Sequence, residues 1–216
     1  MAKLIILILL LSLNLKVEAA IDHLREAQKW VNRVYSLIYS VGCKHTSNPA
    51  RKLGDIKIRR EINCAASASI TYQRAGIIDE GKLVSHTAAV SKNVNIIKHY
   101  DVSDLQQSLK LSVKNYGNLK KGTCDLVKVM AKYNDMPSWL KQKGIMYIQD
   151  SNICISAGDK KIYSCNSTGK TYSKNGVDPL RSSGYTFNSP ILWAVVPRSN
   201  GKSNVDSNTN LKHLPC

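Results

Sequence analysis

Residues 63–78 read NCAASASITYQRAGII, and this stretch places a cysteine where an extended segment meets a helix. The helix is predicted to start at Cys64 and to end at Gly76. Its first residues are small, so it can pack closely against other elements. Helical patterns dominate the sequence up to residue 112, and short strand-like runs follow residue 117.

The position of Cys64 suits a nucleophilic thiol. At a helix start, the positive end of the helix dipole and unpaired backbone N–H groups favour the thiolate. Arg59 and Arg60 add positive charge that acts in the same direction. The alternative is that Cys64 is half of a disulfide that holds the helix to a sheet. The residues leave both interpretations open.

Upstream of this helix, a second helical pattern runs from Asp22 to Val41. Apolar residues recur there at spacings of three and four, which predicts an amphipathic helix. Gly42 is a natural stop for it. Residues 43–60 are polar and contain Asn48-Pro49, which is typical of a loop.

Downstream, the sequence pattern changes from helical to strand-like. A third helix is predicted from Asp101 to Ser112. Beyond Gly117, short runs rich in β-branched residues and tyrosine alternate with turn residues, which fits adjacent antiparallel strands. Helices followed by strands indicate an α+β fold, with N-terminal helices packed on a small antiparallel sheet. The predicted strands are Asp125–Met130, Gly144–Ile148, Ile153–Ile155, Lys161–Tyr163 and Ile191–Val196.

The 216 residues divide into three predicted parts. Residues 1–20 carry an apolar run followed by small residues, as in a signal peptide, and the run is shorter than the roughly 20 residues of a spanning helix. The alternative is an uncleaved anchor. Residues 21–197 form a single α+β domain that is long enough to bury a core. Residues 198–216 are rich in Ser, Asn and Lys, and we expect a mobile tail unless Cys216 ties it down.

Secretion places the six cysteines in an oxidising compartment, where they are compatible with three disulfides. A catalytic thiol would leave an odd number for pairing, which weighs against catalysis. No C-x-x-C pair is present, so a zinc knuckle is not expected, and the sequence predicts no metal and no cofactor. Asn166-Ser167-Thr168 is a candidate glycosylation site. The cysteines are Cys43, Cys64, Cys124, Cys154, Cys165 and Cys216.

Several short motifs follow one another in an order seen in one enzyme family. Asn63-Cys64-Ala65-Ala66 opens the central helix, Cys124-Asp125-Leu126-Val127 comes later, and Gly144-Ile145-Met146-Tyr147-Ile148 follows. This order resembles the NlpC/P60 and CHAP branch of the papain-like cysteine hydrolases. The resemblance implies a papain-like fold of NlpC/P60 type and a nucleophile at Cys64. In that family a His-Val-Gly-Ile-Tyr-Ile-Gly strand carries the catalytic histidine, and a third polar residue lies on the next strand.

The resemblance gives Cys64 no matching histidine. Aligning Tyr147-Ile148 with the family's Tyr-Ile puts Lys143 at the histidine position, and the third polar position falls near Ile155. A lysine that is not buried is protonated at neutral pH and cannot take a proton from a thiol. The candidate base is therefore His86, whose loop leaves the central helix and can fold back across a cleft. Its alternative is a structural or solvated loop histidine.

The remaining features have structural interpretations. Asp150-Ser151-Asn152 has the composition of a hairpin turn, and the alternative is a segment that presents a carboxylate. Residues 185–193 join aromatic side chains to the last strand and are expected to belong to the core and an edge. The other four histidines lie in polar surroundings, at a helix start or in the tail; they are His23, His45, His99 and His213.

Charge narrows the range of partners. Lys and Arg number 31 against 15 Asp and Glu, a formal net charge of +16, so the surface attracts anions. We expect an anionic cell-surface or cell-wall polymer, or a target-cell protein, as the partner. Basic residues are scattered, only 6% of residues are aromatic and no recognition motif is present, so specific nucleic-acid binding is not predicted.

Two functions remain in competition. The first is a secreted basic effector or toxin on the hydrolase scaffold, with the hydrolase activity left open. The second is an active cysteine amidase or endopeptidase that cuts peptidoglycan or peptide bonds, with Cys64 as nucleophile and His86 as base. In size, charge and cysteine content the chain also resembles the parasitoid-killing factors of insect viruses.

Overall fold

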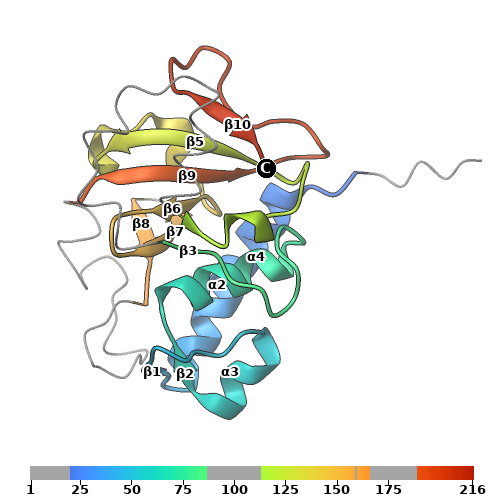
Figure 1. The fold of residues 1–216 in the computed structure, drawn as a ribbon, viewed down its shortest axis with the longest axis vertical. Coiled ribbons are helices and arrows are strands. Elements are labelled where there is room, and N and C mark those ends of the chain that lie inside the picture. Colours follow the sequence, from blue (N-terminus) through green and yellow to red (C-terminus); the bar gives the residue numbers. More distant parts are fainter. Residues whose placement is uncertain (1–19, 87–112, 159, 166–188) are drawn as a thin grey trace, which may run out of the picture.

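The computed structural model describes residues 20–86, 113–158, 160–165 and 189–216. Within them the chain forms three α-helices and a six-stranded antiparallel sheet (Figure 1), so the predicted α+β class is confirmed. Some predicted features lie outside the described residues; they are residues 1–19 of the signal peptide, the helix Asp101–Ser112, His99, Asn166 and residues 185–188.

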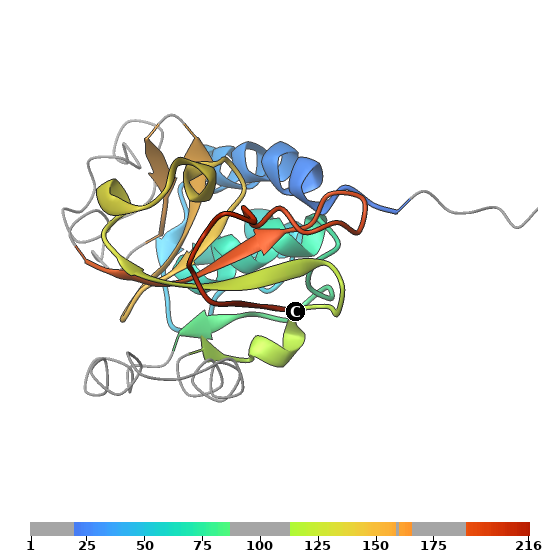
Figure 2. The same ribbon diagram turned by 90° about the horizontal axis from the view of Figure 1, so that it is seen from above.

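Two helices occupy the predicted positions, α2 (His23–Ser40) and α4 (Cys64–Arg74). Helix α2 starts where the side chain of Asp22 accepts a hydrogen bond of 2.9 Å from the N–H of Arg25. Its buried residues repeat every three or four positions, because that face packs against α4 and the sheet. Figure 2 shows the two helices side by side.

Six strands form the sheet, and the five predicted from the sequence are among them. In chain order they are β5 (Cys124–Ala131), β6 (Met146–Ile148), β7 (Ile153–Gly158), β8 (Lys161–Tyr163), β9 (Ile191–Pro197) and β10 (His213–Pro215). Their order in the sheet is β10-β5-β9-β6-β7-β8, and every neighbouring pair is antiparallel.

Both faces of the sheet are buried. Met146, Ile148 and Ile155 belong to the core shared with the helices, whereas Tyr147 belongs to a second core on the opposite face. The 3-10 helices η3 (Tyr133–Asp135) and η4 (Ser138–Lys141) contribute apolar residues to this second core. Burial on both faces explains why the strands read as nearly continuous apolar runs. Trp193 is fully buried, as expected for the end of segment 185–193.

The segment 43–60 is not the loop that its polar composition predicted. Strand β1 (Lys44–His45) pairs in parallel with β2 (Glu61–Ile62), and helix α3 (Leu53–Arg59) lies between them. The prediction was wrong because α3 buries only Ile56, so it shows no apolar periodicity. A further antiparallel pair, β3 (Ser85–His86) with β4 (Val113–Lys114), is followed by the 3-10 helix η2 (Tyr116–Asn118).

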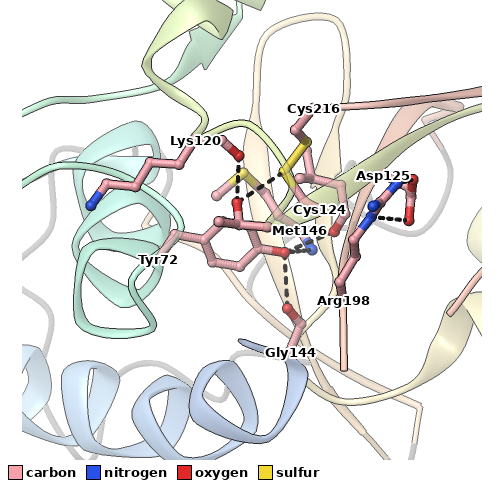
Figure 3. The surroundings of a disulfide bond; sticks show 10 residues. Tyr72, Lys120, Cys124, Asp125, Gly144, Met146, Arg198 and Cys216 are labelled. Carbon is pink, nitrogen blue, oxygen red and sulfur yellow. Dashed lines mark hydrogen bonds and ion pairs between the residues drawn. A yellow bond between two sulfur atoms is a disulfide. The ribbon is translucent and has the colours of Figure 1, made fainter. Parts of the chain in front are cut away.

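The C-terminal residues are tied to the sheet. Strand β10 pairs with β5, and Cys216 forms a disulfide with Cys124 (Figure 3). Beside this disulfide, the guanidinium of Arg198 donates two hydrogen bonds, of 2.7 and 3.1 Å, to the carboxylate of Asp125, which is 2% exposed. The sequence left a mobile tail and a tail tied by Cys216 as alternatives for residues 198–216, and the tie is the one found.

Tyr72 holds α4 against the sheet (Figure 3). Its buried hydroxyl lies 2.8 Å from the carbonyl oxygen of Val195 and 3.0 Å from that of Gly144, and it accepts a hydrogen bond of 2.9 Å from the N–H of Met146. Gly144 has a φ of 93°, and a Cβ there would lie 3.1 Å from the backbone nitrogen of Gln28 in α2. The Tyr72 hydroxyl and the adjacent Gly144 therefore hold α2, α4, β6 and β9 together.

Candidate functional site

Cys64 is the first residue of α4, as predicted. The side-chain oxygen of Asn63 accepts a hydrogen bond of 2.9 Å from the N–H of Ala66, which caps the helix. The amide nitrogen of Asn63 donates to the carbonyl oxygen of Thr46 at 3.1 Å, so the segment before α3 is fixed to the helix start. The half-buried Cys64 forms no disulfide.

Burial raises the pKa of the Cys64 thiol above its ordinary value. The backbone N–H groups of Ile153 and Ala65 hydrogen-bond to the sulfur and lower the pKa, but their effect is smaller than that of burial. Arg59, which was expected to favour the thiolate, lies 3.6 Å from the carboxylate of Glu61. The thiolate expected at the helix start is therefore disfavoured, because burial outweighs the N–H groups.

His86 lies on the short strand β3 and is half-buried. Burial lowers the pKa of its imidazole, and the negative charge of Asp150 opposes this effect. Its buried Nδ1 has no hydrogen-bond partner among the described residues, and the same holds for Oδ1 of Asp150. The imidazole is thus favoured in its neutral form, which a general base requires.

The connection between β6 and β7 interacts with both predicted catalytic residues, Cys64 and His86. At one end, Asp150 acts on the ring of His86; at the other, the N–H of Ile153 hydrogen-bonds to the sulfur of Cys64. In the described part of the chain, no hydrogen bond joins Cys64 to His86. The structure therefore brings a thiol and a neutral imidazole to the same segment without the direct contact of a catalytic pair.

The polar side chains on this segment form a buried network that sequence reasoning missed. The hydroxyl of Ser164 donates to the side-chain oxygen of Asn152 at 2.8 Å, and the amide of Asn152 donates to Gln149 at 3.0 Å. Gln149 in turn donates to the carbonyl oxygen of Ser189 at 2.9 Å. The N–H of Gln149 also bonds to the carbonyl oxygen of Asn152, at 2.9 Å, which closes the predicted turn. Only the composition of that turn was visible in the sequence.

Lys143 lies far from the cysteine along the sheet. A Cβ built on Gly158, at the end of β7, would lie 3.4 Å from the Cβ of Lys143, whereas Cys64 contacts Ile153 at the start of β7. Five residues of an extended strand span roughly 16 Å. Ile155, the other position that the resemblance indicated, is fully buried in the apolar core. Lys143 therefore lies outside the surroundings of the thiol, and the apolar side chain of Ile155 offers no polar group.

The remaining histidines have other roles or positions. The Nδ1 of His23 lies 2.9 Å from the carbonyl oxygen of Ala75 and joins the start of α2 to the end of α4. His45 is half-buried on β1, and burial lowers the pKa of its imidazole. His213 is exposed on β10. None of these three described rings is hydrogen-bonded to Cys64.

The cysteines form one disulfide and leave four free thiols, rather than the three disulfides with which the sequence is compatible. Cys43, Cys154 and Cys165 are buried, and burial raises the pKa of each thiol. Cys64 is the most accessible of the four, because it is only half-buried.

No family model, no curated protein and no solved structure matches this chain. Among the described residues, no group of three or more His, Cys, Asp or Glu side chains could hold a metal ion. The described helices also include none that is both long enough and apolar enough to cross a bilayer.

Proposed function

We propose that this chain is a secreted, basic effector that acts by binding, on an NlpC/P60-like scaffold that has lost its hydrolase chemistry. The observation that carries the proposal is the environment of Cys64. The thiol is partly buried with a raised pKa, and Asn152, the residue before the contacting strand, carries an amide. An amide cannot take a proton from a thiol, so no nucleophile is generated.

The strand that contacts the thiol supports a different alignment of this sequence with the family's histidine motif. In that motif the histidine opens its strand, and we take this strand to be the one that contacts the cysteine helix. Here that strand is β7, since Ile153 bonds to the sulfur. In this alignment the family's His-Val-Gly-Ile corresponds to Asn152-Ile153-Cys154-Ile155, and its final Gly corresponds to Gly158. In this register Asn152, not Lys143, takes the place of the histidine.

The same register accounts for the third polar position. Ser164 follows β8, the next strand, and its hydroxyl bonds to Asn152. The cysteine, histidine and polar residue of the family thus become Cys64, Asn152 and Ser164. The two replacements hydrogen-bond to each other, and Asn152 also to Gln149, instead of orienting a base, which favours a structural role for this part of the scaffold.

Binding to an anionic surface polymer is the activity that the charge supports. The net charge of +16 attracts polyanions without any chemistry at Cys64. The predicted signal peptide would deliver the protein to the outside of a cell, where acidic glycans and wall polymers are found.

The alternative function is an active cysteine amidase or endopeptidase, and one observation favours it. His86 has a lowered pKa, a buried Nδ1 without a partner among the described residues, and a carboxylate nearby in Asp150. A general base has these properties before substrate binds, because the hydrogen bond between base and nucleophile often tightens only in the substrate complex.

A turnover assay separates the two functions. The full-length secreted protein is incubated with purified peptidoglycan and with a peptide library, and released fragments are identified by mass spectrometry. We expect no cleavage above that of a Cys64→Ala control. Cleavage that disappears in both Cys64→Ala and His86→Ala would overturn the proposal and establish the cysteine hydrolase.

A further inference from the structure

A polar cleft of about 400 Å³ opens beside the start of α4. Asn63 and Ala65 line it from the helix. Three further segments contribute: the loop between β1 and α3, the segment from residue 81 to β3, and β4 with η2. A volume of this size is in the range of small-ligand sites in proteins.

The cleft is separate from the surroundings of the thiol. Asn63 and Ala65 line it, but Cys64 between them does not, because its sulfur faces the N–H of Ile153 in the sheet. A ligand in the cleft would therefore contact the outer side of the helix start. Its binding does not depend on the chemistry of Cys64.

The charge of the cleft is positive. Arg51, Lys82 and Lys114 line it, are exposed, and have no ion-pair partner in the described part of the chain. No acidic residue is among its described lining residues. Elsewhere carboxylates do pair with basic side chains, as Asp79 does with Lys120 at 2.8 Å. The cleft therefore concentrates unpaired positive charge.

The rest of the lining is polar. Asn63, Asn115 and Asn118 supply amides, and Ser47 and Ser85 supply hydroxyls. Only three lining residues are apolar, and none is aromatic. Amides and hydroxyls both donate and accept hydrogen bonds, as the hydroxyls of a sugar do. An apolar ligand would find too little apolar surface to replace the water in this cleft.

Side chains of α4 hold the walls of the cleft in place. The amide of Gln73 donates to the carbonyl oxygens of Arg51 and Lys82, at 2.8 Å each, so two basic walls are joined through one residue. Ser69 exchanges hydrogen bonds with the backbone of Val84, which precedes β3. Walls fixed in this way lose little conformational entropy when a ligand binds.

We propose that this cleft binds an acidic oligosaccharide, a short chain of sugars that bear carboxylate or sulfate groups. Its three unpaired cations pair with the acidic groups in charge-assisted hydrogen bonds. Its amides and hydroxyls bind the sugar hydroxyls. The inference rests on the proposed function in taking a surface glycan as the target, but binding in the cleft is measured independently of turnover at Cys64.

Calorimetric titration of the full chain tests this with four named probes: a heparin hexasaccharide, an oligogalacturonate, the neutral N-acetylglucosamine hexamer and a polyglutamate peptide. The test variant combines Arg51→Glu with Lys82→Glu. The matched control combines Lys132→Glu with Lys202→Glu, which changes the net charge equally at exposed positions outside the cleft. Thermal unfolding of each variant confirms that it folds.

We expect wild type to bind both acidic probes and not the neutral hexamer. The cleft variant should bind them at least tenfold more weakly, since each lost charged hydrogen bond is worth about a factor of ten. The control should change by less than about twofold, as expected for screened surface charges. Equal losses in both variants, no binding by wild type, or equally tight binding of a polyglutamate peptide of the same charge would overturn the inference. Cleavage of peptidoglycan, by contrast, would overturn only the proposed function.

Discussion

The hydroxyl of Ser164 donates a hydrogen bond of 2.8 Å to the side-chain oxygen of Asn152, and both residues are almost completely buried. This bond joins the residue after β8 to the residue before β7. It fixes the backbone next to Ile153, whose N–H contacts the sulfur of Cys64. The position of the thiol relative to the sheet therefore depends on a polar network that contains no base.

Replacing Asn152 by leucine should destabilise the protein. The hydroxyl of Ser164 and the side-chain oxygen of Gln149 would each lose a buried partner, which costs roughly 2–4 kcal/mol of unfolding free energy in total. Urea unfolding followed by fluorescence measures the change. The exposed Asn134→Leu is the matched control and should change stability by less than about 0.5 kcal/mol. Equal stability of the two variants would contradict a structural role for Asn152.

Cys64 should react slowly with iodoacetamide at neutral pH. Because burial raises its pKa, the thiolate is a minor species at neutral pH and its fraction grows only in the alkaline range. The measurement is the alkylation rate at Cys64 as a function of pH, with the labelled site located by mass spectrometry. Cys64→Ser is the control for the assignment. A rate that reaches its plateau near pH 7 would show an activated thiol and would favour the hydrolase.

The local parts of the fold could be predicted from the sequence. Helices α2 and α4 and strands β5 to β9 follow from periodicity and turn residues, which are properties of neighbouring positions. Helix α3 could not be predicted, because Ile56 is its only buried residue. The pairing of Cys124 with Cys216 could not be deduced either, since six cysteines allow 15 pairings.

The candidate site was predicted only in part. The place of Cys64 at a helix start is local and was confirmed. The network around Asn152 depends on which strand contacts that helix start, and β6 and β7 are both short apolar runs a few residues apart. The alignment on β6 indicated Lys143, which lies at the far end of the hairpin, whereas the register proposed above uses β7. Strand neighbours are set by tertiary packing, so the sequence pattern could not decide between them.

The disulfide should contribute strongly to stability. Cys124 and Cys216 are 92 positions apart, and closing so long a loop restricts the unfolded chain. The double variant Cys124→Ala/Cys216→Ala should lose about 2–5 kcal/mol of unfolding free energy in guanidinium titrations. A reductant should lower the stability of wild type and leave that of the double variant unchanged. If the reductant affects both equally, another disulfide has formed among the free thiols.

Stability should fall as the pH is lowered below the ordinary pKa of histidine, and His86 should account for part of the loss. Burial lowers the pKa of His86 below its ordinary value of 6.5, so the unfolded chain binds the proton more readily than the folded one. Unfolding free energy then decreases as the pH falls from 6.5 towards the folded pKa. His45 shifts in the same direction, so the comparison is made in a His45→Gln background. Adding His86→Gln should flatten the dependence between pH 7.5 and 5, whereas Asp150→Asn should steepen it, because Asp150 opposes the shift. An unchanged slope in the His86→Gln variant would show that its imidazole titrates alike in both states.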